Sequence, residues 1–157
     1  MRANHKNFNV TFVEDYGKLP PVNVIPQDFS RAVLNIMNNA CYAVFAKSKE
    51  ANDSSYRPTI SISLHQDGDN VRLTIEDNGT GIRPDVIRHL FTPFFTTKPI
   101  GEGTGLGLSI TKNIIEQKHH GSVNVESEPG LYSRFTITIP INPKKQDTTH
   151  GPQDTKR

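Results

Sequence analysis

Asp77 is the first candidate for chemistry, because the sequence places its carboxylate on an apolar surface. It ends the run 71–77, whose alternation is typical of a half-buried strand, and it shares the parity of the apolar residues. A carboxylate on that face is costly unless a hydrogen-bond donor meets it. Gly79 and Gly81 follow and permit a positive φ and close approach of a ligand to the backbone. The stretch predicts either a pocket for a donor group or a tight turn, since Asp-Asn-Gly is common turn chemistry.

Asn35 and Asn39 form the second candidate, because they lie four residues apart in a segment with helical periodicity. That spacing places them on one face of the helix. Asparagine is a poor interior helix residue, since its amide competes with the backbone, so the pair needs a reason. Two amide oxygens on one face can ligate a hard cation such as Mg²⁺. Asn38 lies on a different side and is predicted to be a solvated residue.

A glycine-rich segment is the third candidate. Glycine occupies every second position from 101 to 107, which predicts a mobile loop rather than a packed element. Thr104 can cap the helix that begins nearby, and a loop feeding a helix N-terminus presents N–H groups and a positive dipole end to an anion. With Lys98 upstream and Asp77 before it, these features favour a pocket for a triphosphate.

A small set of strands and helices must position these residues. Apolar alternation predicts strands near residues 8–12, 60–64, 71–77, 123–125 and 135–140, and a hairpin turn at 66–69. A helix introduced by Pro26 and Asp28 carries the apolar stripe Phe29, Val33, Met37, Ala40 and Val44, and residues 47–57 are predicted to be a loop. Further helices are predicted from Pro84 to about Leu90 and from near Thr104 to His120. Gly121 is the predicted C-cap of the last helix, whose dipole His119 and His120 would complement.

Length and composition indicate a single domain. The 157 residues suffice for a real core, and a net charge of +2 gives no reason to expect nucleic acid or a membrane surface as a partner. No apolar run approaches the roughly 20 residues of a spanning helix, and the one cysteine, Cys41, is predicted to be a small buried hydrophobe. We expect an N-terminal extension at 1–7, a domain at 8–141, a disordered tail at 142–157, and a cytoplasmic location.

Four motifs in order resemble those of a known family. Residues 34–40 are similar to an asparagine box, 77–82 to a first glycine box, 91–98 to a phenylalanine box, and 103–108 to a second glycine box. Each box alone is weak, but four in order over roughly residues 8–141 are specific. The chain resembles the ATP-binding catalytic domain of bacterial sensor histidine kinases, within the superfamily shared with gyrase, the Hsp90 chaperones and MutL.

The resemblance implies an α+β two-layer sandwich, with helices on one face of a mixed, mostly antiparallel sheet. It implies that Asp77 accepts a hydrogen bond from the adenine amino group, that Asn39 ligates Mg²⁺ with Asn35 beside it, and that a lid over about 83–103 carries Lys98 to the phosphates. Asn35, Asn39 and Lys98 would be the catalytic residues. The implied nucleotide-binding positions are Asn39, Asp77, Gly79, Gly81, Ile82, Lys98, Gly103, Thr104, Gly105, Leu106, Gly107 and Leu108.

The implied reaction is transfer of the γ-phosphoryl group of ATP to a histidine on a dimerisation domain, followed downstream by a response regulator. Asn35 cannot act as a general base, which argues against efficient ATP hydrolysis. No phospho-acceptor histidine motif is visible, so we expect the chain to be a monomeric part of a larger kinase that cannot phosphorylate itself.

The sequence departs from the family pattern at two further positions. Tyr42 stands where many sensor kinases have lysine, and Tyr132 stands where the third glycine box usually has a second glycine, which puts the adenine-side role of Ser133 in doubt. The alternatives are a stand-alone serine kinase of the anti-sigma-factor type and a nucleotide-binding module without transfer activity. Asn35 and the Phe-rich Thr-Thr-Lys segment disfavour the serine kinase, which usually has glutamate at position 35.

Overall fold

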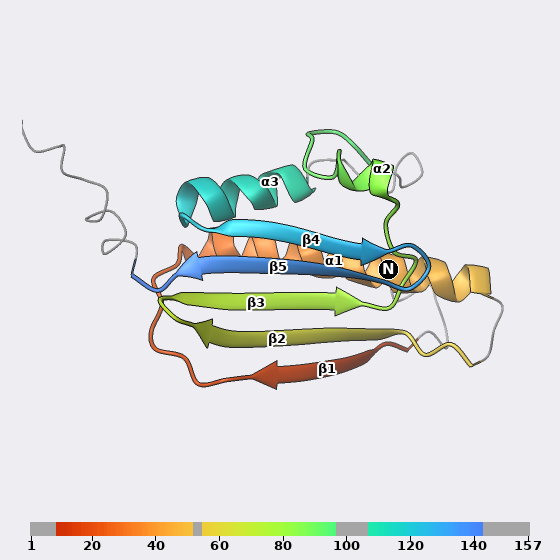
Figure 1. Ribbon diagram of the computed structural model, residues 1–157, viewed down its shortest axis with the longest axis horizontal. Helices are drawn as coiled ribbons and strands as arrows, with labels where there is room; N and C mark the ends of the chain where they lie inside the picture. Colours follow the sequence, from red (N-terminus) through yellow and green to blue (C-terminus); the bar gives the residue numbers. More distant parts are fainter. Residues whose placement is uncertain (1–8, 52–54, 97–106, 143–157) are drawn as a thin grey trace, which may run out of the picture.

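A computed structural model describes residues 9–51, 55–96 and 107–142 of the chain (Figure 1). The strands are β1 (Thr11–Tyr16), β2 (Thr59–Asp67), β3 (Asn70–Asp77), β4 (Ser122–Glu128) and β5 (Tyr132–Pro140). The helices are α1 (Pro26–Ala51), α2 (Pro84–Ile87) and α3 (Gly107–Asn113), which continues as the π-helix η2 (Ile114–Lys118). The predicted N-terminal extension, most of the predicted glycine-rich segment and almost all of the predicted tail lie outside the described residues.

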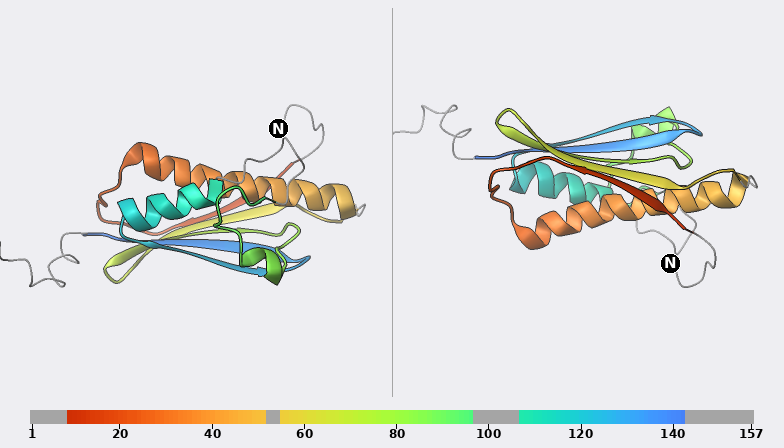
Figure 2. Two further views of the ribbon diagram at one scale, coloured as in Figure 1. Left: turned by 90° about the horizontal axis from the view of Figure 1, so that it is seen from above. Right: turned by 90° about the horizontal axis from the view of Figure 1, so that it is seen from below.

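The strands form one sheet in the order β1-β2-β3-β5-β4. Strand β1 runs parallel to β2, and the other neighbours are antiparallel. Helices α1 and α3 lie on the same face of this sheet (Figure 2). The predicted mixed, mostly antiparallel sheet with helices on one face is therefore confirmed. The first strand lies at Thr11–Tyr16, a few residues later than its predicted position, and forms an edge of the sheet.

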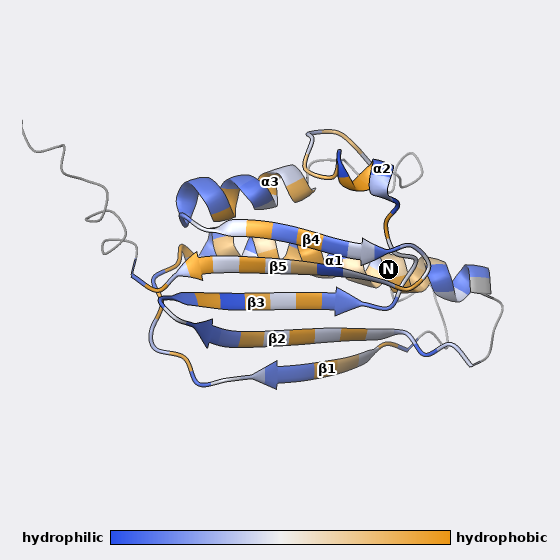
Figure 3. Cartoon of the chain, in the orientation of Figure 1, coloured by the Kyte–Doolittle hydropathy of each residue, from blue (hydrophilic) through white to orange (hydrophobic). Residues whose placement is uncertain are grey.

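The hydrophobic core lies between the sheet and α1. Apolar residues alternate with polar ones along β3 and β5 (Figure 3), so that one face of each strand is buried. On α1 the buried positions are Ala32, Ile36, Ala40 and Val44. The predicted stripe shares only the last two of these, and its other members, Phe29, Val33 and Met37, are half-buried beside the core. Two of the four buried positions are thus alanines, whose small side chains permit close packing, whereas larger side chains lie partly exposed beside the core.

Helix α1 is longer than the sequence predicts, because residues 47–51 continue it instead of beginning a loop. Lys47 gives a physical reason. Its ammonium donates a hydrogen bond to the Gly130 carbonyl at 2.7 Å and lies 5.0 Å from the centre of the Tyr56 ring. These contacts tie the last turns of α1 to the β4–β5 turn. Among the described residues, no helix is both long enough and apolar enough to cross a membrane.

The end of the last helix also differs from its prediction. His120, and not Gly121, has a positive φ of 59°. His119 is buried, and its Nε2 accepts a hydrogen bond from the Ile25 N–H at 2.9 Å. Its Nδ1 therefore carries the proton and donates to the Ile114 carbonyl at 2.9 Å. Both ring nitrogens of His119 are therefore used in hydrogen bonds to backbone groups, instead of the predicted role of a cation at the helix end.

Candidate nucleotide-binding site

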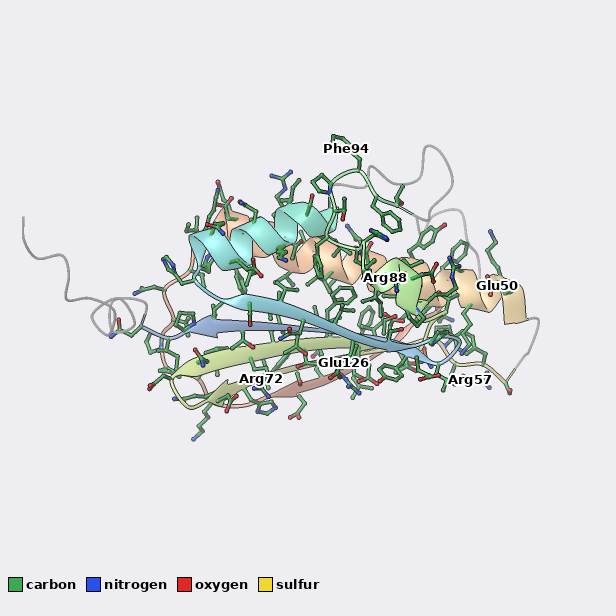
Figure 4. The ribbon with its side chains drawn as sticks, turned by 45° about the horizontal axis from the view of Figure 1, so that its top comes forward. Glu50, Arg57, Arg72, Arg88, Phe94 and Glu126 are labelled. Atoms are coloured by element: carbon green, nitrogen blue, oxygen red, sulfur yellow. The ribbon has the colours of Figure 1, made fainter. Side chains whose placement is uncertain are left out.

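A cavity of about 590 Å³ lies between α1, the end of β3, α2 and the start of α3, a volume in the range of small-molecule sites. Helix α1 supplies one wall, which runs toward Glu50 near its end (Figure 4). The predicted site residues that line the cavity are Asn35, Asn39, Asp77, Gly81, Ile82, Gly107 and Leu108. Gly79 is not among the lining residues, and Lys98, Gly103, Thr104, Gly105 and Leu106 lie outside the described part of the chain.

Asp77 forms the polar inner end of the cavity. Strand β3 keeps its alternation to the last residue, so the carboxylate is buried, with only 3% of the residue exposed. Burial raises the pKa of Asp77 to about 7, against a hydrogen bond from the Gly79 N–H that lowers it, and Glu76 raises it further. That hydrogen bond measures 2.9 Å to Oδ1. The cavity therefore ends in a hydrogen-bond acceptor whose charge is costly without a further donor.

The two glycines after Asp77 allow neighbouring backbone of the same chain to pack closely against this loop. A Cβ on Gly79 would lie 2.5 Å from the carbonyl carbon of Ala43, so the loop packs directly on α1. Gly81 has a φ of 71°, and a Cβ there would clash with the backbone of the β4–β5 turn. The sequence correctly predicts a positive φ in this stretch, but the close approaches described here are to neighbouring backbone.

Asn35 joins α1 to α3 at the other end of the cavity. Its Nδ2 donates to the Gly107 carbonyl at 3.0 Å and to the Thr111 hydroxyl at 3.2 Å. Thr111 is fully buried and donates to the same carbonyl at 2.9 Å. Asn39 lies one turn further along the same wall. Asn38 is exposed, as predicted, although it also borders the cavity.

A hard cation at this end would meet amide oxygens and not a carboxylate cluster. In the described ranges, no group of three or more His, Cys, Asp or Glu side chains could hold a metal ion. Oxygen donors of the asparagine type suit Mg²⁺, which keeps several waters and is usually shared with substrate phosphates. The donor set therefore fits a cation that arrives with a phosphorylated ligand. Arg83 is the cationic lining residue of the described walls, and it is ion-paired with Asp85 at 3.1 Å.

The aromatic segment after α2 divides between the cavity and the surface. Phe95 lines the cavity, whereas Phe94 is 73% exposed and has a φ of 69°. Figure 4 shows Phe94 at the outer edge of the molecule. The three phenylalanines of this motif therefore do not act as one packed group.

Sequence reasoning overlooked Tyr56 and Ser127 and placed the role of Ser133 in doubt. Tyr56 donates a hydrogen bond to the Asn78 carbonyl at 2.9 Å, beside Asp77. Ser133 pairs with Asp77 across β3 and β5, is buried, and lines the cavity, despite the degraded glycine motif around it. Ser127 accepts the Ile82 N–H at 2.7 Å. The pairing of Ser133 with Asp77 keeps Ser133 at the cavity whatever residue stands at position 132, whereas no local signal in the sequence marks Tyr56.

Comparison with known proteins identifies the family. The chain belongs to the histidine kinase-, DNA gyrase B- and HSP90-like ATPase family, whose sequence profile matches residues 24–143. The family resemblance predicted from the four motifs is therefore confirmed, and membership of this ATPase family implies that the domain binds ATP.

Individual relatives of the chain are sensor histidine kinases. The chain is 34% identical over 145 residues to the sensor histidine kinase ZraS of Escherichia coli K12, covering 92% of the chain and 28% of that protein. It is 37% identical over 141 residues to the signal transduction histidine-protein kinase AtoS of the same organism, covering 88% of the chain and 21% of that protein. The chain thus spans about a quarter of the length of these relatives.

A solved structure agrees in fold. The catalytic domain of histidine kinase ThkA, in a nucleotide-free form, superimposes with a TM-score of 0.70 at 28% identity. The match covers 87% of this chain and 82% of that one. The chain is therefore similar over most of its length to an isolated histidine kinase catalytic domain.

Proposed function

We propose that this chain is the catalytic domain of a sensor histidine kinase, which binds ATP with Mg²⁺ and donates the γ-phosphoryl group to a histidine on a dimerisation domain. The observation that carries the proposal is the buried Asp77 carboxylate at the inner end of the cavity. Together with family membership, it supplies the acceptor that an adenine amino group needs. A response regulator would receive the phosphoryl group next, and the need for ATP is the reason to propose a cytoplasmic location for the domain.

The two ends of the cavity suit the two ends of ATP. Asp77 would accept the adenine amino group, with Ser133 beside it on β5. The amide oxygens of Asn39 and Asn35 would face the phosphate end, and α1 holds both on one wall. Bound Mg²⁺ would neutralise phosphate charge there. Lys98 is proposed as a further phosphate contact, although it lies outside the described residues.

The chemistry would be in-line phosphoryl transfer. A histidine imidazole nitrogen would attack the γ-phosphorus, and the bond from that phosphorus to the bridging oxygen would break to release ADP. Protein residues would contribute positioning and charge stabilisation. Asn35 supplies no general base for water, which favours transfer over hydrolysis.

Calorimetric titration tests the pocket first. ATP, ADP and GTP are titrated into the full chain with and without Mg²⁺, alongside Asp77→Asn and the control Tyr16→Phe, an exposed position on the edge strand β1 that does not line the cavity. We expect adenine-selective, Mg²⁺-sensitive binding that is lost in Asp77→Asn and retained in the control. Unchanged ATP affinity in Asp77→Asn would show that the adenine pocket is wrongly assigned.

Phosphoryl transfer needs a separate experiment. The chain is mixed with γ-labelled ATP and a histidine-bearing helical domain of a sensor kinase such as ZraS, and the label is tested for acid lability. We expect acid-labile phosphohistidine on the helical domain and none on the chain alone. Acid-stable phosphoserine on a partner, or tight binding without any transfer, would overturn the proposed reaction.

A further inference from the structure

The peptide unit between Asn78 and Gly79 is hydrogen-bonded at both ends. Its carbonyl oxygen accepts the Tyr56 hydroxyl at 2.9 Å. Its N–H donates to Oδ1 of Asp77 at 2.9 Å. A single rigid amide plane therefore connects Tyr56 to the carboxylate. Hydrogen bonds arranged in such a chain polarise one another in a low-dielectric interior.

Tyr56 belongs to a network of hydrogen bonds around Asn78, outside the cavity, that holds this peptide in place. The Asn78 side chain accepts the Thr59 N–H at 2.8 Å and donates to the Arg57 carbonyl at 2.9 Å. The backbone N–H of Asn78 donates to the Thr59 carbonyl at 3.2 Å. Tyr56 provides the short contact to the carbonyl oxygen itself. Neither Tyr56 nor Asn78 lines the cavity, so both act on a ligand only through Asp77.

Tyr56 is itself fixed by α1. The Lys47 ammonium lies 5.0 Å from the centre of its ring and also donates to the Gly130 carbonyl. Burial raises the pKa of Tyr56 to about 12, and the negative charge of Asp77 adds to the effect. The phenol therefore stays protonated over the physiological pH range and serves as a donor.

We propose that Tyr56 is a positioning residue for adenine recognition, which orients the Asn78–Gly79 peptide so that its N–H is directed at the Asp77 carboxylate. This inference rests on the proposed function and deepens it. The hydrogen bond from the Gly79 N–H lowers the pKa of Asp77 and so opposes the rise that burial causes. Losing the Tyr56 hydroxyl frees the carbonyl end of the peptide, weakens that hydrogen bond, and makes the ionised carboxylate harder to maintain.

Charged side chains from several elements surround this carboxylate and must be held constant in any test. Glu76 of β3 faces the other side of the sheet, where Arg134 of β5 pairs with it at 2.8 Å. Further charged groups on the surrounding elements include Lys47 and Glu50 of α1, Arg57 next to Tyr56, and the ion pair of Arg83 and Asp85 at the start of α2. Tyr56→Phe changes none of these charges and keeps the ring under Lys47.

Carbon-13 NMR of the side-chain carboxyls tests the inference without any ligand. The nucleotide-free full chain is titrated as wild type, Tyr56→Phe and the control Tyr16→Phe, with Asp77→Asn to assign the signal. Tyr16 is an exposed residue of the edge strand. We expect the Asp77 midpoint to rise by about half a pH unit or more in Tyr56→Phe, roughly a threefold change in proton affinity, and to stay in place in Tyr16→Phe. An Asp77 midpoint equal to that of wild type in Tyr56→Phe would overturn the inference.

Calorimetry with ATP from pH 6 to 9 adds a functional readout. Titration of the ATP phosphates is common to all variants and cancels in the ratio to wild type. We expect Tyr56→Phe to bind about threefold more weakly near pH 6.5 and to approach wild type near pH 9. Equal weakening at every pH would indicate a merely structural role and overturn the inference.

If Asp77→Asn binds ATP as wild type does, the proposed function fails instead. If only Asp77→Asn loses binding and Tyr56→Phe matches wild type, the inference alone fails.

Discussion

Asn35 donates its side-chain N–H to the backbone carbonyl of Gly107, across 3.0 Å and between two different helices. The sequence hypothesis gave Asn35 a role toward metal and phosphate, together with Asn39. The structure shows that its amide nitrogen is already used to hold the first turn of α3 against α1. Only the amide oxygen of Asn35 is therefore available for the proposed cation. Asn35 therefore has a structural role between α1 and α3 in addition to its proposed role as a metal ligand.

Replacing Asn35 by aspartate should damage the fold of the phosphate end. A carboxylate oxygen in place of Nδ2 cannot donate to Gly107 and would face its carbonyl. We expect a loss of about 1–3 kcal/mol in the free energy of unfolding, with faster amide exchange around Gly107 to Thr111. MgATP affinity should fall as well, although aspartate is the stronger metal ligand. Asn38→Asp, on the exposed side of the same helix, is the matched control for urea unfolding. Equal stability of the two variants would contradict this assignment.

The nucleotide-free domain should become less stable as pH rises through the range that ionises Asp77. Its pKa is about 7 in the folded chain and near 3.8 otherwise. The folded state therefore holds the proton more tightly, so stability falls from about pH 4 to pH 7 and levels off above. Asp77→Asn should remove this loss, on the order of 2–4 kcal/mol between pH 4 and 8.

Urea unfolding of wild type and Asp77→Asn at several pH values measures that difference. Asp67→Asn, in the exposed β2–β3 hairpin, controls for removal of a carboxylate as such. Parallel stability curves for wild type and Asp77→Asn would show that Asp77 ionises as easily in the folded chain as in the unfolded one.

The parts of this molecule that sequence predicts are those governed by local pattern. Alternation along β3 correctly places Asp77 on the buried face, and the four motifs correctly identify the family. The hydrogen-bond network around Asn78 was not predictable. Tyr56 and Asn78 are 22 positions apart, and only the β2–β3 pairing brings them together. The contact between Asn35 and Gly107 spans 72 positions. Such contacts depend on tertiary packing, which periodicity does not encode.

Helix α1 shows the same limit in its packing. The pattern of large apolar residues selects Phe29, Val33 and Met37, yet Ala32 and Ile36 are the residues that are almost completely buried. Alanine carries little weight in a hydrophobic pattern, but its small side chain permits close packing on the buried face of the helix. Sequence therefore predicts the presence of this helix better than the rotation about its axis.

His119 should be essential to the junction between the segment before α1 and the end of η2. Its two ring nitrogens pair the Ile25 N–H and the Ile114 carbonyl, and only 4% of the residue is exposed. His119→Leu would leave both backbone groups buried without these partners, and we expect a loss of about 2–4 kcal/mol. His120→Asn is the neighbouring control, since asparagine tolerates the positive φ found there, and it should unfold like wild type. A small effect of His119→Leu in thermal unfolding would show that solvent replaces these hydrogen bonds.

Gly79 and Gly68 offer a matched pair that separates steric contact from backbone strain. A Cβ on Gly79 would meet the Ala43 backbone at 2.5 Å, so Gly79→Ala must push the loop after Asp77 away from α1. Gly68 has a φ of 63° but no atom within 4 Å of its Cβ position, so Gly68→Ala adds only the strain of a left-handed residue, about 1 kcal/mol. We expect Gly79→Ala to lose at least about 2 kcal/mol and to bind ATP poorly, because the Gly79 N–H is displaced from Asp77. Gly68→Ala should bind ATP with unchanged affinity. If calorimetry and urea unfolding give the two variants the same losses, contact with α1 does not position this loop.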